Sequence, residues 1–232
     1  MLDLFPEGFE EVERADGVEL VAYTDASGEE RLWEAFGGAS GADVVEGWED
    51  SWRRFHRPVR VDRLWIGPPW EEPDRDALPV VVDPGRAFGT GAHPTTRLCL
   101  ELLQELEPSS LVDAGCGSGV LSIAAAKLGF APVYAVDLEQ AAVDATLANA
   151  AANGVAVEAW RLDVLTEDLP EAGVTLANIL LDTVERITPR VRSPLLLASG
   201  YLVADEPALP AWRRIDRREA EGWAADLFAR TP

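Results

Sequence analysis

The amino-acid sequence predicts an α/β fold in which a doubly wound parallel sheet follows a small N-terminal α+β segment. From residue 94 onward, apolar runs of strand length alternate with helical patterns, which is typical of a parallel sheet covered by helices on both faces. The first part of the chain instead holds short strand-like runs around one helical stretch. Over the 232 residues we expect a reduced α+β domain at 1–47, a linker helix at 48–59 and the main domain at 60–232.

The elements of the N-terminal segment follow from strand-like runs and from helix start and stop signals. Strands are predicted at 9–14, 18–23 and 42–46, and a helix at 27–36, where Ser27 can cap the first turn. Aromatic residues at helical spacing predict the linker helix, and a proline ends it.

The main domain is predicted to begin with extended chain and then to alternate strands and helices. Residues 59–66 are expected to form one extended run, and a proline-rich loop leads to a strand at 80–82. The helix at 94–106 begins with a proline, which suits the first helical position, and carries leucines on one face. The elements expected after it are strand 111–113, helix 119–128, strand 133–137, helix 139–152, strand 155–162, strand 174–178, helix 182–191 and candidate closing strands at 195–197, 213–216 and 224–228.

The composition describes a globular protein with an excess of acidic residues. Hydrophobic residues make up 47% and charged residues 26%, which excludes disorder as the main state. With 41 acidic and 20 basic residues the net charge is −21, which disfavours direct binding of nucleic acid. Residues 1–50 hold 15 acidic residues and two arginines, a local charge of −13. This segment is either a recognition surface for a basic partner or a solvated surface that keeps the protein soluble.

The sequence carries neither membrane nor metal signals. No apolar run approaches the roughly 18 residues that a membrane-spanning helix needs, and residues 1–13 lack the basic and apolar regions of a secretory signal. We therefore expect a cytoplasmic protein without a membrane partner. Two cysteines, Cys99 and Cys116, and two histidines, His56 and His93, do not form a metal-ligand cluster, so no metal is expected.

A glycine-rich turn between an apolar strand and an alanine-rich helix is the central chemical signal. It begins at Asp113 and has glycines at Gly115, Gly117 and Gly119. Glycines let the backbone approach a ligand closely, and the helix N-terminus offers unpaired N–H groups. A dinucleotide-binding turn needs its third glycine three positions after the second, whereas Gly119 comes two positions after Gly117. This spacing, headed by an acid, resembles the pattern of class I methyltransferases, which bind S-adenosylmethionine.

Two further aspartates, Asp137 and Asp163, end the next two strands of the predicted sheet. At the carboxyl end of a parallel strand, Asp137 can accept hydrogen bonds from ribose hydroxyls, and Asp163 is placed to meet an adenine amino group. Each aspartate alone could instead be an exposed loop acid or a helix N-cap residue. Three acids on successive strands, counting Asp113, favour the ligand role.

The loop at 83–96 and the strand that ends at Asn178 complete the candidate site. The loop holds three glycines, three threonines and a histidine ahead of a helix, which suits a mobile lid over a ligand. His93 could act as a general base, but no partner carboxylate lies near it in the sequence, so positioning or stacking against the cofactor is preferred. Asn178 can present its carbonyl oxygen to an amine nucleophile, and its alternative role is to cap the following helix.

With these residues assembled, the chain resembles the PrmA family, the bacterial methyltransferases of ribosomal large-subunit protein eleven. The resemblance runs from about Trp48 to the C-terminus. The segments that carry it are Trp48–Trp52, Phe55–Pro58, Leu64–Ile66, Asp83–Pro84, Ala87–Thr96, the glycine turn, Asn153–Val155, Ala177–Leu180, Ser199–Gly200 and Glu219–Arg230. Members of the family carry a ferredoxin-like recognition domain, and the segment before Trp48 is shorter than that pattern, hence the reduced domain expected here.

The resemblance implies a Rossmann-like methyltransferase that uses S-adenosylmethionine to methylate lysine and N-terminal amines of a basic ribosomal protein. The residues expected to contact the cofactor are Phe88, Gly89, Thr90, His93, Thr96, Gly115, Gly117, Gly119, Asp137, Asp163 and Asn178, with Asn178 also orienting the amine. Two alternatives remain: a methyltransferase of the same fold that acts on another protein or a small amine, and a non-catalytic cofactor-binding or ribosome-assembly module. A nicotinamide dehydrogenase is disfavoured by the glycine spacing.

Overall fold

The computed structural model describes residues 10–14, 17–21, 57–83 and 91–231, which fall in two compact units, Met1–Ser51 and Trp52–Pro232. In the first unit, strands β1 (Glu10–Arg14) and β2 (Gly17–Val21) form an antiparallel hairpin. They correspond to two of the three strands predicted for this segment. The helix expected at 27–36 and the strand expected at 42–46 lie outside the described residues.

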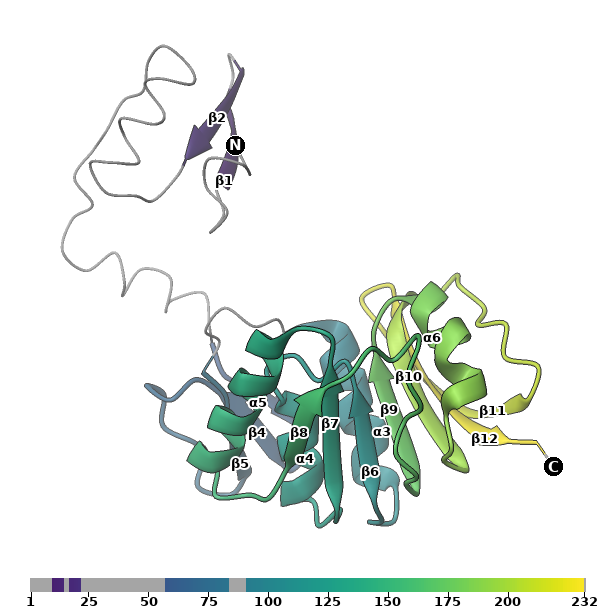
Figure 1. Ribbon diagram of the computed structural model, residues 1–232. Coiled ribbons are helices and arrows are strands. Elements are labelled where there is room, and N and C mark those ends of the chain that lie inside the picture. Colours follow the sequence, from purple (N-terminus) through teal and green to yellow (C-terminus); the bar gives the residue numbers. More distant parts are fainter. Residues whose placement is uncertain (1–9, 15–16, 22–56, 84–90, 232) are drawn as a thin grey trace. The chain divides into compact units, whose positions relative to one another are not determined.

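The second unit is built on a seven-stranded sheet in the order β11-β12-β10-β9-β6-β7-β8 (Figure 1). Its strands are β6 (Leu111–Ala114), β7 (Val133–Asp137), β8 (Glu158–Arg161), β9 (Val174–Asn178), β10 (Leu195–Leu202), β11 (Trp212–Ala220) and β12 (Trp223–Arg230). The five strands from β8 to β10 are parallel, as predicted, whereas β12 and β11 add to β10 as an antiparallel hairpin. The three closing strands are longer than predicted, and β8 is shorter.

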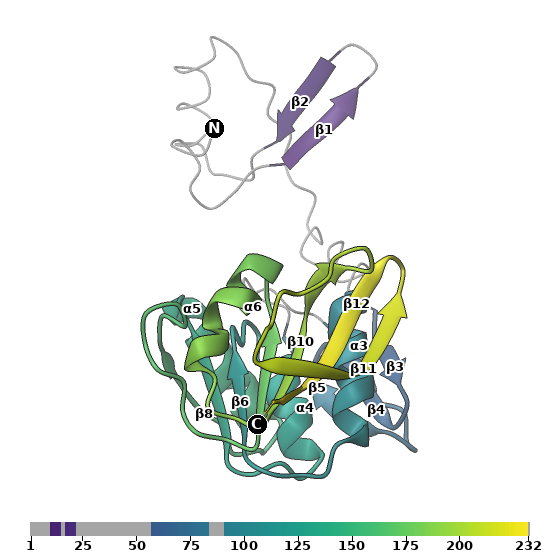
Figure 2. The same cartoon turned by 90° about the vertical axis from the view of Figure 1, so that its right-hand side faces the viewer.

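Helices cover both faces of this sheet, which confirms the doubly wound α/β fold. They are α3 (Pro94–Glu105), α4 (Val120–Lys127), α5 (Gln140–Ala152) and α6 (Leu181–Ile187). Neighbouring residues of one strand point to opposite faces: Leu111 and Leu176 join the core shared with α3, α4 and α5, while Val112 and Ala177 join the core under α6. Figure 2 shows α3 and α6 on opposite sides of β10.

Two expectations about local structure were wrong. Residues 59–66 are not one extended run, because the chain reverses at Asp62, whose φ is 49°, between β3 (Val59–Val61) and β4 (Leu64–Gly67). Strand β5 (Leu78–Val81) then pairs in parallel with β4, forming a separate three-stranded sheet. Because Val59 begins β3, the linker helix does not extend to residue 59, and residues 48–56 lie outside the described part of the chain.

The helix predicted over 182–191 ends early for a local reason. After α6, residues Thr188–Arg190 form one 3-10 turn that contains Pro189. Proline has no N–H to continue the helical hydrogen-bond ladder, so an α-helix does not pass through it without strain. Among the helices that the structure describes, none is long and apolar enough to cross a membrane.

Candidate active site at the carboxyl edge of the sheet

The carboxyl ends of β6, β7 and β9 bring the glycine turn, Asp137 and Asn178 to one edge of the sheet. Strand β6 pairs in parallel with β7 on one side and with β9 on the other, so the residues that follow these three strands emerge at the same edge. In open α/β sheets this edge is where ligands bind. The predicted constellation is therefore assembled by the topology.

The glycine turn has a backbone shape that requires glycine. Gly115, Gly117 and Gly119 have φ values of 86°, 54° and 81°, in the left-handed region that side chains disfavour. A Cβ atom at Gly115 would lie 2.5 Å from the Cγ2 of Ile179, and one at Gly119 would lie 2.9 Å from the side chain of Thr146. The turn thus sits between the end of β9 and helix α5 with no room for side chains at these two positions.

Asp137 is held by two backbone N–H groups. Gly117 N donates to its Oδ2 at 3.0 Å, and Glu139 N donates to its Oδ1 at 3.0 Å. The half-buried carboxylate is therefore oriented both toward the glycine turn and toward the start of α5. Each oxygen retains a lone pair for a further donor, so both the ligand role and the local role considered for this residue are compatible with the geometry.

Asp113, by contrast, lies beneath the turn rather than at its surface. It is 1% exposed, and Ser122 Oγ donates to its Oδ2 at 2.6 Å. Burial raises the pKa of Asp113 to about 6, the Ser122 hydrogen bond opposes this, and the nearby Asp137 charge adds to it. This aspartate supports the turn from within the core.

Asp163 makes local hydrogen bonds after β8. Its Oδ1 accepts from Leu165 N at 2.9 Å and its Oδ2 accepts from the hydroxyl of Thr166 at 3.0 Å. These contacts shape the turn that follows the strand. The expected contact of Asp163 with an adenine amino group stays a prediction.

Asn178 and Thr96, which are 82 positions apart, meet across the site. Asn178 Nδ2 donates to Thr96 Oγ1 at 3.4 Å, and Thr96 is buried in the first turn of α3. With its amide nitrogen on Thr96, Asn178 has Oδ1 as the atom that can accept a hydrogen bond from an incoming group. This orientation is the one that presenting a carbonyl to an amine requires.

The backbone that follows Asn178 is fixed by β10, a feature that the sequence reasoning did not use. Ile179 N donates to Ser199 O at 3.1 Å, and Gly200 has a φ of 105°. A Cβ atom at Gly200 would lie 2.1 Å from the carbonyl oxygen of Ile179. The Ser-Gly pair in a strand otherwise rich in leucine was the available signal, because glycine inside a strand often marks a close backbone approach.

His93 caps helix α3. Its Nδ1 accepts a hydrogen bond from Thr95 N at 3.3 Å and lies 2.8 Å from Thr95 Oγ1. Its ring packs edge-on against Trp223, with ring centroids 4.9 Å apart. The expected cofactor contact of His93 stays a prediction, and the neighbouring candidates Phe88, Gly89 and Thr90 lie outside the described residues.

Two exposed leucines at the same edge were also missed. Leu138 follows Asp137 directly and is 52% exposed, and Leu180 follows β9 and is 74% exposed. An apolar residue one or two positions after a motif acid or amide was the signal that could have found them. Such side chains can cover apolar parts of a ligand beside the polar groups that orient it.

The sheet order, the glycine turn and the acid that ends β7 define the class I methyltransferase fold. Among solved structures, the ribosomal protein L11 methylase of Lactobacillus delbrueckii subsp. bulgaricus matches with a TM-score of 0.67 and 26% identity, over 76% of this chain and all of that one. The 16S rRNA methylase RmtB matches with a TM-score of 0.50 and 19% identity, over 61% of this chain and 67% of that one, which shows the fold alone.

Sequence comparison then identifies the family. The profile of the family described as ribosomal protein L11 methyltransferase (PrmA) matches residues 24–205, and the chain belongs to this family. A protein named ribosomal protein L11 methyltransferase from Symbiobacterium thermophilum is 42% identical over 200 residues, covering 78% of this chain and 65% of the relative. One of the same name from Caldanaerobacter subterraneus is 38% identical over 224 residues, covering 86% and 72%. The chain thus spans about two thirds of the length of these curated relatives.

Proposed function

We propose that this chain is an S-adenosylmethionine-dependent N-methyltransferase that modifies ribosomal protein L11 (large-subunit protein eleven) on lysine and N-terminal amines. The observation that carries the proposal is the meeting of Asn178, oriented by Thr96, with the glycine turn at one edge of the sheet. The names of the sequence relatives support the substrate. Such a substrate implies that the protein acts in the cytoplasm.

The residues at this edge fit that cofactor. Gly115 and Gly117 are partly exposed and carry no side chain, so a ligand can approach the backbone of the turn there. The oriented carboxylate of Asp137 can accept hydrogen bonds from two ribose hydroxyls. Exposed Leu138, next to it, can cover one face of a purine. We assign Gly115, Gly117, Gly119, Asp137, Asp163, Thr96 and Asn178 to cofactor binding, together with Phe88, Gly89, Thr90 and His93 of the preceding loop.

When bound, S-adenosylmethionine supplies a methyl group already activated by a sulfonium. The protein therefore needs to align a neutral amine and exclude water more than it needs a strong base. Asn178 Oδ1 would accept a hydrogen bond from the amine and fix its direction of approach, while Thr96 fixes the amide. Gly200 and Ser199 hold the backbone of Ile179 so that this orientation is kept.

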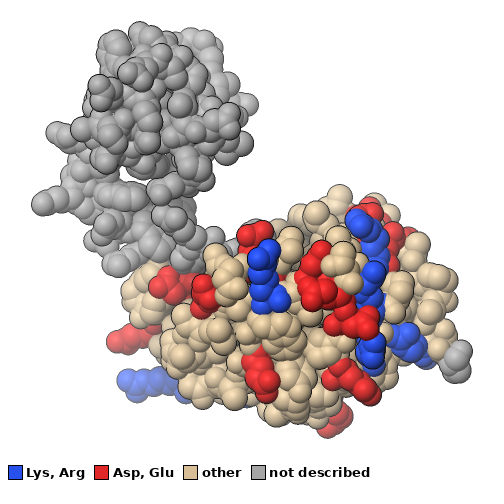
Figure 3. All heavy atoms as spheres, viewed as in Figure 1, with Lys and Arg blue, Asp and Glu red and all other residues tan. Residues whose placement is uncertain are grey.

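We assign substrate capture to residues 1–47, joined by the linker at 48–59 to the methyltransferase domain at 60–232. Residues 1–50 carry a charge of −13, and residues 51–232 carry the remaining −8. On the face drawn in Figure 3, acidic and basic side chains of the second unit lie next to one another. Removing residues 1–47 should raise the KM for a basic protein substrate and leave cofactor affinity unchanged, whereas an unchanged KM would assign the acidic segment to solubility.

Methyl transfer to purified L11 tests the proposal. The protein is incubated with labelled S-adenosylmethionine and L11, and mass spectrometry locates the label. Asn178→Ala should lose turnover by on the order of 100-fold while it retains most of its cofactor affinity, because misalignment by about 1 Å has that effect on rate. Label on another protein of a ribosomal extract would favour a different substrate, and cofactor binding without transfer would favour a non-catalytic module.

Asp137→Ala tests the cofactor assignment separately. Loss of two charge-assisted hydrogen bonds should weaken S-adenosylmethionine binding by about ten- to a few-hundred-fold, measured by calorimetry. If Asp137 only caps α5, the substitution should instead lower the free energy of unfolding by about 1 kcal/mol and leave Kd unchanged. A thermal melt of the unliganded variant distinguishes these results.

A further inference from the structure

We propose that Asn149 and Thr146 of helix α5 are positioning residues for the cofactor site. Their side chains hold two carbonyl groups of the glycine turn, and Asn149 also joins the turn to the end of strand β5. The affinity for the cofactor should then depend on two side chains that lie behind the turn and have no part in the contacts assigned above. The inference rests on the proposed function.

Three polar side chains of α5 share one face of the helix. Thr146, Asn149 and Asn153 are spaced by three and four positions, which places them along the same side. Thr146 is fully buried and Asn149 is 5% exposed. Buried amides and hydroxyls need hydrogen-bond partners, so the partners of these groups show what the face is built to hold.

Two of the three side chains bind the glycine turn. Thr146 Oγ1 donates to Gly117 O at 3.1 Å, and Asn149 Nδ2 donates to Ser118 O at 2.9 Å. On the other side of the turn, Gly117 N donates to Asp137. The turn is therefore tied to the acid of β7 on one side and to α5 on the other.

These two hydrogen bonds fix the orientation of consecutive peptide groups. The peptide bond is planar and trans, so a carbonyl held in one direction sets the direction of the N–H in the same peptide group. Glycine has no Cβ atom to restrict its backbone, so Gly117 and Gly119 do not by themselves fix the left-handed φ values that they adopt. The α5 side chains supply the restraint that the glycines lack.

Asn149 also connects the turn to β5. Its Oδ1 accepts from Asp83 N at 3.1 Å, two residues beyond the end of the strand. Asn153 binds the same strand, because its Oδ1 accepts from Val81 N at 2.9 Å and its Nδ2 donates to Val81 O at 2.6 Å. Both amides thus join α5 to β5 and the residues just after it, whereas of the two only Asn149 also binds Ser118 of the turn.

This difference provides a matched control on one helix. Asn149→Ala and Asn153→Ala each remove an amide that binds β5 or the residues just after it, but the first also releases Ser118 O. Thr146→Val removes the bond to Gly117 O and keeps the shape of the side chain. In the full chain, Kd for S-adenosylmethionine and S-adenosylhomocysteine is measured by calorimetry, and stability is measured by urea unfolding.

We expect Asn149→Ala to weaken binding of both ligands by roughly three- to ten-fold and Thr146→Val by a similar or smaller factor, as expected for one net hydrogen bond. Asn153→Ala should change Kd by less than about two-fold although it loses comparable stability. In the methyl-transfer assay, Asn149→Ala should raise the KM for the cofactor by the same factor and leave kcat nearly unchanged.

Three results would overturn the inference. Wild-type affinity in both Asn149→Ala and Thr146→Val would show that the turn does not need α5, and Thr146→Val alone decides if Asn149→Ala does not fold. Equal weakening in Asn153→Ala would assign the effect to β5 packing. Failure of the wild-type chain to bind either ligand would overturn the proposed function and this inference with it, whereas the first two results leave the proposed function intact.

Discussion

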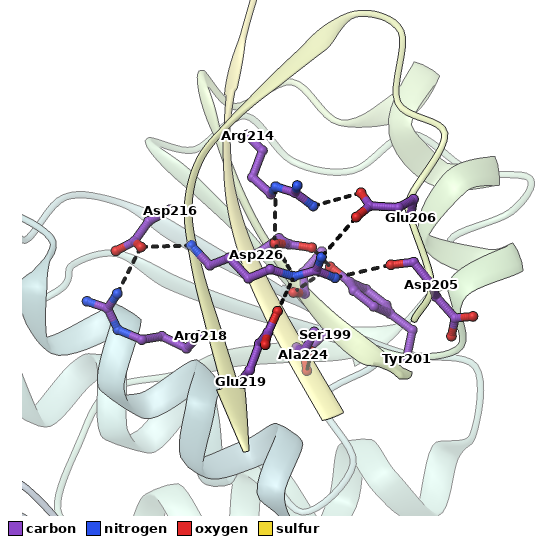
Figure 4. Close-up of polar contacts among 12 residues, drawn as sticks. Ser199, Tyr201, Asp205, Glu206, Arg214, Asp216, Arg218, Glu219, Ala224 and Asp226 are labelled. Carbon is purple, nitrogen blue, oxygen red and sulfur yellow. Dashed lines mark hydrogen bonds and ion pairs between the residues drawn. The ribbon is translucent and has the colours of Figure 1, made fainter. Parts of the chain in front are cut away.

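The α5 side of the glycine turn and the C-terminal hairpin of β11 and β12 are both held by buried polar side chains, which are neutral on α5 and charged in the hairpin. Around the turn, the α5 side chains are neutral and bind backbone carbonyl and N–H groups. In the hairpin, the central group is the carboxylate of Asp226 on β12, which is fully buried and faces arginines on β11 (Figure 4). The two regions therefore respond differently to pH, salt and substitution.

The Asp226 cluster consists of Asp226, Tyr201, Arg214, Arg217 and Glu206. The hydroxyl of Tyr201 donates to Asp226 Oδ2 at 3.0 Å, and the Nε atoms of Arg217 and Arg214 lie 3.2 and 3.7 Å from Oδ1. The exposed carboxylate of Glu206 accepts hydrogen bonds from both Arg214 and Arg217. Burial raises the pKa of Asp226 although Tyr201 and both arginines lower it, so the cost of removing the carboxylate from water outweighs these contacts.

Neutral and charged buried groups suit different tasks in a fold. A neutral amide that binds backbone groups fixes a direction and remains unchanged over a wide range of pH and salt, which suits a turn that must present a fixed shape to a ligand. In a buried charge network, the attraction between opposite charges offsets the large cost of removing those charges from water. The loss of one partner therefore leaves the remaining buried charges without compensation.

Removing the carboxylate from the hairpin should have the largest effect. Asp226→Ala removes the buried counter-charge of Arg217 and one of the two acceptors of the Tyr201 hydroxyl. Because Arg217 keeps Glu206 and Tyr201 keeps Ala198 O, the free energy of unfolding should fall by about 3 kcal/mol in urea titration, at the low end of the loss for a broken buried ion pair. Asp216→Ala is the control on β11, because Asp216 is partly exposed, and it should cost less than about 1 kcal/mol. Similar losses in both variants would show that burial does not set the cost.

The pH dependence of stability should be carried by buried carboxylates and not by α5. The folded pKa of Asp113 is raised to about 6 from an unfolded value of 3.8, so its contribution to stability is fully present below pH 3.8 and is lost as pH rises through 6. That loss amounts to up to about 3 kcal/mol.

Asp113→Asn, which can still accept the Ser122 hydrogen bond, should remove this part of the decline between pH 4 and 7, measured by urea unfolding at several pH values. Asn149→Ala should retain the wild-type slope. If the decline of the free energy of unfolding with pH is unchanged in Asp113→Asn, then burial does not raise the pKa of Asp113 in the folded protein.

Replacing Asn153 of α5, whose side chain binds Val81 of β5, should lower the free energy of unfolding moderately and to the same extent at every salt concentration. Asn153→Ala removes two hydrogen bonds to Val81 and should lower the free energy of unfolding by about 1–2 kcal/mol. The loss should be the same at 0.1 M and 1 M salt, since no charge is involved. A loss that shrinks at high salt would contradict the neutral character given to this region.

The smallest effect should come from the surface of the charged region. Arg218 of β11 donates to both carboxylate oxygens of Glu105, the last residue of α3, at 2.8 Å. Because Glu105 is exposed and Arg218 is partly exposed, Arg218→Ala should lower the free energy of unfolding by at most about 1 kcal/mol, and this loss should shrink at 1 M salt. A double-mutant cycle with Glu105→Ala measures the coupling, and a salt-independent coupling would place this pair with the buried groups.

Much of the fold could be predicted because the strands of a covered parallel sheet are short and apolar. Strands β7 and β9 have the predicted bounds, 133–137 and 174–178, and α3 begins at the predicted proline. The reversal at Asp62 could not be predicted, because an aspartate in the left-handed region leaves no spacing signal in an extended run. The antiparallel closure by β11 and β12 depends on long-range pairing that strand periodicity does not encode.

The part of the candidate site that lies at the ends of strands could be predicted from the sequence. Asp137, Asn178 and the glycine turn meet because parallel strands end at one edge. Asn149 and Thr146 escaped notice because single polar residues in an alanine-rich helix are usually solvated, and only the packing of α5 on the turn buries them. Asp226 escaped for a related reason, since a charged residue in a strand is ordinarily expected to face water.

The two outer strands of the seven-stranded sheet have consequences for self-association. An outer strand presents unpaired N–H and C=O groups that can pair with another chain and seed aggregates. Strand β11 is nine residues long, but it carries Arg213, Arg214, Arg217 and Arg218, and its pairing with β12 is interrupted by a bulge between Arg214 and Asp216. At the opposite edge, β8 has only four residues and begins and ends with exposed charges. The charged side chains and the bulge of β11 should disfavour its pairing with a second molecule, and β8 is too short to pair over any length.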